Sequence, residues 1–379
     1  MMWIVGERIR QAREFRGLSQ SELAQRAGIK QPTVAQYEAG LTQPSESVLQ
    51  SIALATGFPV SFFSRETIPF PEGSLFFRRR RSLPAKAYRE IYRSAQIVFE
   101  LALHLLQFIE GISMRIPRLT GVSPEEAARR TRTSLGLEPD TPIKHLTRTL
   151  ERGGVLVLRL PIARPERDFD GFSTWAGKPT ELPVIVVAPN LPGDRLRFTI
   201  AHELGHLVLH PNQRIALDEF EQQANRFAAE FLLPEDRFRD EFPAFSDVEA
   251  LLPLKQRWGV SLQSLLVRAY ELRMIPKHSY ERSFRKLASL GWRSEEPLDV
   301  PVEKPRLLTQ MAELVYGKPI ATEKLARAVG ITPRLAEEIL AAQRAEFSHT
   351  TRSLPHKTEI IQFTSRSRRL EKADGRNEW

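Results

Sequence analysis

The spacing of apolar positions predicts a mostly helical chain with a small sheet near its middle. Residues 85–111 read as one long amphipathic helix, and residues 216–233 repeat apolar side chains at helical spacing. Two β-branched runs, residues 154–160 and 183–188, are bounded by glycine and proline and predict strands. Residues 170–175 are a candidate third strand. The predicted fold class is α+β, with helical regions before and after the sheet.

The N-terminal segment predicts three short helices. The first spans residues 6–15. Ser19 begins the second as its N-cap, with Glu22 closing a capping box and Gly28 ending the helix. Gln31 is the expected cap of the third helix, whose first turn contains a proline. Two short helices joined by a glycine turn, the second presenting amide side chains, are typical of a helix-turn-helix that contacts base edges.

The stretch LSQSELAQRAGIKQPTVAQYEAG resembles the Xre/Cro-like repressor class, and the match covers about residues 6–64. The resemblance implies a double-stranded DNA operator as partner, bound by a homodimer, with Gln20 on phosphate and Gln31, Thr33 and Gln36 on bases. A helical protein-interaction module without DNA binding is the alternative. The expected phosphate-binding charge comes from Arg8, Arg10, Arg13, Arg16, Arg26 and Lys30.

One spacing in the chain specifies a chemistry, and it is HELGH at residues 202–206. His202 and His206 lie four residues apart, so on a helix both imidazoles share one face and can bind one Zn²⁺. Glu203 is rotated by about 100°. It can therefore reach a metal-bound water without acting as a ligand, which makes it the candidate general base. A chance occurrence of the motif on an ordinary amphipathic helix is the alternative.

A catalytic zinc site needs a third protein ligand, and the predicted helix at residues 216–233 offers three acids. Its buried face is marked by Ala224, Phe227, Ala228 and Phe231. Glu221 projects from that face, whereas Glu219 and Glu230 align with the polar side. A glutamate in an apolar interface is costly unless it is paired or metal-bound, so Glu221 is the predicted ligand and Asn225 a supporting partner. The alternative for Glu221 is an acid that favours the helix dipole.

RFTIAHELGHLVLH, followed by E-x-x-x-N-x-F-A-A-E-F-L-L-P at residues 221–234, resembles the ImmA/IrrE family of zinc metallopeptidases over about residues 171–274. The resemblance implies a zincin-like fold, with Zn²⁺ as cofactor and Mn²⁺ as a substitute in vitro. It also implies cleavage of a helix-turn-helix repressor in a stress, DNA-damage or mobile-element response. Gln223 departs from the glutamate of many relatives and is not expected to touch the metal.

Several groups near the motif are candidates for supporting roles. Arg195, Arg197 and His210 lie close to HELGH in sequence and are candidate oxyanion or ligand-supporting groups. His210 is equally a candidate cationic helix cap. An exposed strand edge of the small sheet is expected to bind substrate backbone. A stretch around residues 70–77, expected to be exposed, is a candidate for self-cleavage.

The predicted domains follow from these motifs. They are residues 1–66 (helix-turn-helix), 67–118 (a linker with arginines at 78–81, then the long helix as spacer or dimer seam), 119–275 (peptidase) and 276–379 (helical, with a basic tail). Residue Ser123 is expected to begin a helix by a capping box. Residues 253–272 and 322–340 have helix-turn-helix-like patterns and are interpreted as packing hairpins.

Composition narrows the function class. The chain has 379 residues, a formal net charge of +9 and no cysteine, which excludes disulfides and a thiolate zinc site. No apolar run suits a signal peptide or a membrane span, so we expect a cytoplasmic protein without membrane contact. The prediction is a DNA-binding transcriptional regulator carrying a zinc endopeptidase that cuts a repressor-type protein, in trans or itself. The alternative is a non-proteolytic repressor or antitoxin that keeps the peptidase fold as sensor or scaffold.

Overall fold

The computed structural model describes residues 3–75, 83–111, 113–161, 169–178, 180–211, 218–244 and 247–344. The chain divides into two units, residues 1–347 and 348–379, and all described residues belong to the first. The arginines at 78–81 and the basic tail, for which predictions were made above, lie outside the described residues. Within the described ranges, no helix combines the length and the apolarity needed to cross a membrane.

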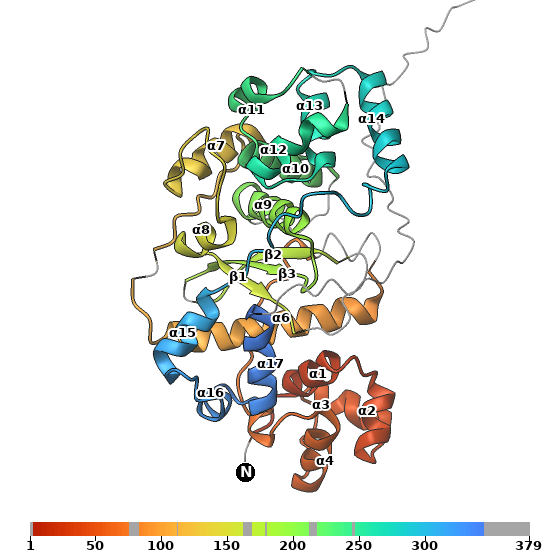
Figure 1. Cartoon of the computed structure of the whole chain (residues 1–379). Coiled ribbons are helices and arrows are strands. Elements are labelled where there is room, and N and C mark those ends of the chain that lie inside the picture. The colour runs from red at the N-terminus through yellow and green to blue at the C-terminus, as the bar shows by residue number, and fades with distance from the viewer. Residues whose placement is uncertain are drawn as a thin grey trace, which may run out of the picture. The chain divides into compact units, whose positions relative to one another are not determined.

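The N-terminal domain consists of short helices, as predicted (Figure 1). They are α1 (Gly6–Phe15), α2 (Gln20–Ala27), α3 (Gln31–Glu38), α4 (Glu46–Thr56) and the 3₁₀ turn η1 (Val60–Phe62). The capping box is confirmed, because the Ser19 hydroxyl accepts from the Glu22 N–H and the Glu22 carboxylate accepts from the Ser19 N–H. The predicted cap of α3 was wrong. Lys30 is the N-cap and Gln31 is the first helical residue.

The long helix α6 (Ala85–Leu106) joins this domain to the sheet, and it ends before the predicted residue 111. It packs against α1 on one side and against β1, α15 and α16 elsewhere (Figure 1). Arg93 of α6 pairs with Glu14 and Glu7 of α1, each at 2.7 Å. The buried face of α6 is covered by the same chain, and its role as a spacer or as a dimer seam stays a prediction.

Within the described residues, the sheet has three strands in the order β1-β3-β2, and all three predicted strand regions are confirmed. β1 (Leu156–Arg159) runs parallel to β3 (Leu182–Val187), and β2 (Gly171–Ala176) runs antiparallel to it. Nearly every strand residue is buried. Helix α9 (Gly193–Leu209) covers one face, and α6 lies on the opposite side (Figure 1).

At one position on each outer strand, another part of the chain bonds to the outer edge of the sheet. On β1, the Gln343 side chain donates to the Arg159 carbonyl at 2.7 Å and accepts from the Arg159 N–H at 3.0 Å, as a neighbouring strand would. On β2, Ser74 donates its N–H to the Ser173 carbonyl at 2.8 Å, and the Ser173 N–H donates to the Ser74 hydroxyl at 2.8 Å. The expectation of an exposed edge is therefore wrong at Ser173, because the linker before α6 lies there.

The remaining helices surround α9 and the sheet. They are α7 (Pro124–Ser134), α8 (Leu146–Arg152), α10 (Asp218–Leu232), α11 (Glu235–Glu241), η2 (Val248–Leu251), α12 (Leu252–Trp258), α13 (Leu262–Glu271), α14 (Lys277–Ser289), α15 (Leu307–Tyr316), α16 (Thr322–Val329) and α17 (Pro333–Arg344). Ser123 caps α7 as predicted by accepting from the Glu126 N–H. The Glu126 carboxylate instead pairs with Arg130 at 2.7 Å, so the box is only half formed.

The two C-terminal hairpins, α12–α13 and α16–α17, have the predicted form, each with a glycine in the left-handed conformation between its helices. In both, the second helix buries its apolar face. The interpretation of both pieces as packing hairpins stays a prediction.

Candidate metal centre

A close crossing of two helices builds the site. Gly205 on α9 lies under Ala224 of α10, where an added Cβ would stand 3.2 Å from the Ala224 Cα and 3.1 Å from the Phe227 ring. Any larger side chain at residue 205 would therefore push α10 away. The glycine of HELGH thus allows α10 to approach closely enough to bring Glu221 over the two histidines.

The donor atoms of His202, His206 and Glu221 converge, all within 4.8 Å of one another. The Nε2 atoms of His202 and His206 are 3.1 Å apart. Glu221 places Oε1 3.2 Å from His206 Nε2 and Oε2 3.8 Å from His202 Nε2. Tetrahedral zinc with ligand bonds of about 2.0–2.1 Å needs donor separations of about 3.3 Å. The three residues therefore fit a zinc ion.

Asn225 orients one of these histidines. Its Oδ1 lies 2.8 Å from His202 Nδ1. An amide oxygen can only accept, so this contact places the proton on Nδ1 and leaves the Nε2 lone pair for a metal. Asn225 lies one turn after Glu221 on α10, where the helical spacing placed it.

A hydrogen-bonded chain supports the other histidine. His206 Nδ1 lies 3.2 Å from His210 Nδ1, and His210 Nε2 lies 2.8 Å from Gln223 Oε1. If His206 Nδ1 donates, His210 accepts at Nδ1 and donates from Nε2 to Gln223. Burial lowers the pKa of His210 to about 4, which keeps this imidazole neutral near pH 7. His210 thus contacts a candidate ligand and does not act as the alternative cationic cap.

Glu203 is enclosed by two serines. Glu203 is only 1% exposed. Its Oε2 accepts from the Ser74 hydroxyl at 2.7 Å and lies 2.9 Å from the Ser173 hydroxyl. Sequence reasoning identified neither serine, because one lies in the linker and the other on a strand, with no local signal pointing to Glu203.

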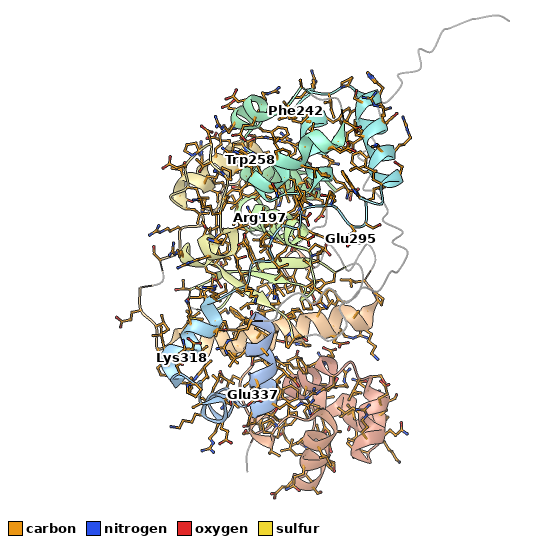
Figure 2. All side chains as sticks on the ribbon, in the orientation of Figure 1. Arg197, Phe242, Trp258, Glu295, Lys318 and Glu337 are labelled. Carbon is orange, nitrogen blue, oxygen red and sulfur yellow. The ribbon has the colours of Figure 1, made fainter. Side chains whose placement is uncertain are left out.

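Three predictions around the motif are wrong. Glu230 is buried rather than on the polar side, because α7 and α13 flank it and supply Arg129, at 3.1 Å, and Arg268. Arg195 pairs with Asp170 at 2.8 Å instead of facing the metal site. Arg197, whose position Figure 2 labels, is buried. Its guanidinium donates to the carbonyls of Gly259 and Ile143 and to Glu303.

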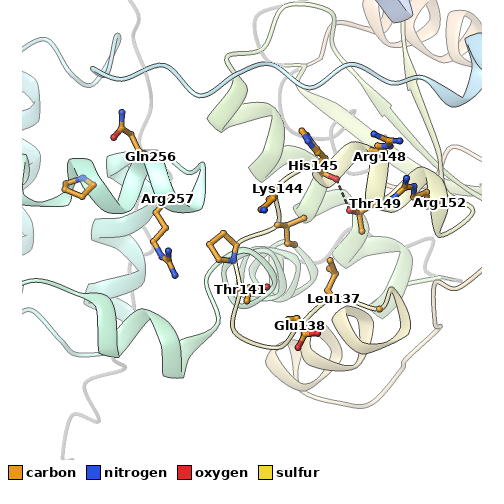
Figure 3. A pocket seen from close by; sticks show the side chains of 14 residues that line it. Leu137, Glu138, Thr141, Lys144, His145, Arg148, Thr149, Arg152, Gln256 and Arg257 are labelled. Carbon is orange, nitrogen blue, oxygen red and sulfur yellow. Dashed lines mark hydrogen bonds between the residues drawn. The ribbon is translucent and has the colours of Figure 1, made fainter.

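A basic surface cavity of about 1060 Å³ lies between the α8 region and α12 (Figure 3). His202, His206 and Glu221 are not among its lining residues. Its cationic lining residues are Lys144, Arg148, Arg152 and Arg257. Arg257 also pairs with Glu241 at 2.8 Å. The cavity is therefore separate from the chemistry of the α9–α10 crossing.

The predicted DNA-contacting residues of the N-terminal domain differ in exposure. Lys30, Gln31 and Gln36 are exposed, and Thr33 is half-buried. Gln31 donates to Gln20 at 2.8 Å, which links the start of α3 to α2. Gln20 in turn donates to the buried Glu38 at 2.9 Å, a contact that orients its amide.

The expectation that six basic side chains of the N-terminal domain bind phosphate is wrong for two arginines. Arg13 is buried and pairs with Glu38 at 2.5 Å. Arg8 is buried and pairs with Glu100 of α6 at 2.6 Å. A buried, paired guanidinium is not available to phosphate. These two residues hold the domain together and join it to α6.

Comparisons with known proteins agree with this architecture. A metallopeptidase family described as the IrrE N-terminal-like domain matches residues 150–270, and a helix-turn-helix family matches residues 9–63. None of the curated proteins matches the chain significantly. The crystal structure of Bacillus thuringiensis PlcR in complex with the peptide PapR7 and DNA is 14% identical, with 76% of this chain and 93% of that chain covered and a TM-score of 0.16. The chain thus combines a helix-turn-helix family match over residues 9–63 with an IrrE N-terminal-like metallopeptidase-family match over residues 150–270, in an α+β fold.

Proposed function

We propose that this protein is a DNA-binding transcriptional regulator whose zinc-dependent endopeptidase hydrolyses a peptide bond in a repressor-type protein, in a stress, DNA-damage or mobile-element response. The observation that carries the proposal is the convergence of His202, His206 and Glu221 within 4.8 Å. A carboxylate on the residue next to a ligand, together with this donor set, is the arrangement that peptide hydrolysis at a metal requires. We place the protein in the cytoplasm, where its operator DNA and repressor substrates are found.

The roles follow from the geometry. His202, His206 and Glu221 would hold the zinc, which supplies Lewis acidity and lowers the pKa of a water to about 7. Glu203 takes the proton from the attacking water and passes it to the leaving amine. Asn225 and His210 contact Nδ1 of His202 and His206 respectively, and would hold both imidazoles in the tautomer whose Nε2 carries the metal-binding lone pair.

The DNA-binding half rests on α2 and α3. Gln31 and Gln36 are exposed amides on α3, and two amide atoms can bond bidentately to adenine. Gln20, Lys30 and Thr33 lie nearby in the same helix pair as candidate phosphate and base contacts. We propose that a homodimer places two copies on half-sites one helical turn apart.

The test compares the wild-type protein with Glu203→Gln, both loaded with zinc or manganese. Each is incubated with a purified helix-turn-helix repressor, and fragments are identified by mass spectrometry. We expect the wild type to cut the repressor, and Glu203→Gln to bind the metal without cutting. Cleavage by both proteins would remove Glu203 from the mechanism.

The non-proteolytic alternative is favoured by one observation, the covered edge of β2 with Ser74 bonded to Glu203. On that alternative, Glu203→Gln regulates its promoter as the wild type does, and no repressor is cut under inducing conditions. A reporter assay beside the cleavage assay distinguishes the two functions.

A further inference from the structure

The turn formed by residues 72–75, here called the linker turn, lies where a peptidase of this design needs open space. Leu75 donates its N–H to the Glu72 carbonyl at 3.1 Å, which closes the turn. Ser74 then bonds through its backbone and its hydroxyl to Ser173 on the outer edge of β2. The Ser74 hydroxyl also donates to Glu203 at 2.7 Å. Ser74 of the linker thus bonds both to the outer edge of β2 and to Glu203, the proposed base.

Gly73 makes this close approach to the strand feasible. A Cβ at residue 73 would overlap the Ser173 carbonyl oxygen and lie 2.6 Å from the Thr174 Cβ. The Gly73 backbone is also left-handed, with a φ of 55°, a conformation that glycine adopts without steric cost. A larger residue here would therefore be excluded from the docked position by space and by backbone conformation.

Both sides of the linker turn are anchored by burial. Phe70 is 4% exposed, and its ring centroid lies 5.1 Å from that of Phe99 on α6 and 6.3 Å from that of Phe172 on β2. The Tyr92 hydroxyl of α6 donates to the Phe70 carbonyl at 2.6 Å. Leu75 is fully buried. The stretch around residues 70–77 was expected to be exposed. This expectation is wrong for Phe70, Ser74 and Leu75, which are buried, and residues 76 and 77 lie outside the described residues.

We propose that the linker turn is an autoinhibitory element that keeps the peptidase latent. It covers the edge of β2 that an extended substrate would pair with. Its Ser74 hydroxyl also occupies the Glu203 carboxylate, which would otherwise accept a proton from water. Release of the turn exposes the strand edge at Ser173 and removes the Ser74 hydroxyl from Glu203, which keeps its contact with the Ser173 hydroxyl. This inference rests on the proposed peptidase function.

A different role for Ser74 makes the opposite prediction. If the hydroxyl only positioned Glu203 for catalysis, its removal would lower activity. If the hydroxyl inhibits, its removal raises activity, while Ser173 still contacts Glu203 at 2.9 Å. The sign of the change in Ser74→Ala therefore separates the two roles.

The first experiment measures cleavage of fluorescently labelled casein, an unstructured general substrate, by the zinc-loaded full-length chain. Because a hydrogen bond to a charged group corresponds to about a tenfold or larger shift in an equilibrium, we expect Ser74→Ala and Gly73→Val to raise kcat/KM at least about tenfold. Ser64→Ala is the matched control, since its hydroxyl donates to the Ser61 carbonyl at 3.2 Å, within the helix-turn-helix domain that precedes the linker. We expect this control to behave as wild type.

The second experiment measures docking without activity or metal. The chain has no cysteine, so a single introduced thiol reports on one site. Leu75→Cys should react with a maleimide far more slowly than Leu54→Cys, whose parent residue is 87% exposed. Adding Gly73→Val to Leu75→Cys should bring the rate up towards that of the exposed site.

The outcomes distinguish failure of the proposed autoinhibition from failure of the proposed peptidase function. Equal labelling of Leu75→Cys and Leu54→Cys would overturn docking. Slow labelling, with equal and measurable cleavage by wild type, Ser74→Ala and Gly73→Val, would overturn inhibition and leave the proposed function standing. A fall in activity in Ser74→Ala would make Ser74 a positioning residue instead. No cleavage by any zinc-loaded variant, on casein or on repressor, would overturn the proposed function, and the inference would fall with it.

Discussion

Removal of the Glu221 carboxylate tests the metal centre most directly. In Glu221→Ala, the oxygens that lie 3.2 Å from His206 Nε2 and 3.8 Å from His202 Nε2 are lost, and two imidazoles remain. Loss of a residue that only supports a ligand costs about 10–100-fold in metal affinity. Loss of a ligand itself should reach at least the upper end, about 100-fold or 2.7 kcal/mol. Asn225→Ala, which removes only the 2.8 Å contact to His202, should fall within that range.

The assay is zinc competition with a chromogenic chelator on the purified full-length chain, followed by metal content after dialysis. Glu219→Ala is the matched control, because Glu219 lies on the same helix, is exposed, and accepts a hydrogen bond from the Gln223 side chain at 3.0 Å. We expect Glu219→Ala to keep about one zinc per chain, as Glu203→Gln should. Equal zinc loss in Glu219→Ala and Glu221→Ala, or none in Glu221→Ala, would refute the choice of ligand.

Three further predictions concern other parts of the chain. Gln31→Ala should relax base preference at one position by about 1–3 kcal/mol in a binding assay across operator variants, whereas a uniform loss on all sequences would argue against base contact. Glu230→Ala should lower the free energy of unfolding by about 3–5 kcal/mol in urea titrations, because it leaves the buried Arg268 without its carboxylate. Burial raises the pKa of Glu151 to about 7, so the folded state binds this proton more tightly than the unfolded state. The resulting stability is present below about pH 4.5 and is lost as pH rises through 7, and Glu151→Gln should remove up to about 3 kcal/mol of that pH dependence in unfolding curves at pH 5 and 8.

Local signals in the sequence were sufficient for much of the fold. The Ser19–Glu22 capping box acts within one helical turn, so its residue types alone identify it. The spacing of His202 and His206 likewise fixes their common face. Glu221 required one further step, the helical periodicity of α10, and the structure brings its carboxylate to the histidines.

The failures at Glu230, Arg8 and Ser74 share one physical cause, which is a partner distant in sequence. Glu230 was assigned to the polar side because the helix alone does not reveal the arginines that α7 and α13 bring to it. Arg8 looked like a phosphate contact because its charge is visible in the sequence, whereas its pairing with Glu100 is not. Ser74 lies 129 residues from Glu203 along the chain, in a linker whose composition suggested exposure. A charged or polar residue is therefore predicted wrongly as exposed when the fold brings a bonding partner to it from a distant part of the sequence.

Helix α6 connects the two halves of the proposed function through neighbouring turns. Its Arg93 and Glu100 hold α1 of the helix-turn-helix domain, through Glu14 and Arg8 respectively. Its Tyr92 holds Phe70, just before the linker turn that covers Glu203. A ligand that favoured one position of α1 over another would act on the same helix that anchors the turn. Because coupling between two binding sites is reciprocal, any effect of operator DNA on release of the turn would be matched by an equal effect of that release on DNA affinity. A regulator built in this way would therefore need no separate sensor domain to relate its place on DNA to the state of its peptidase site.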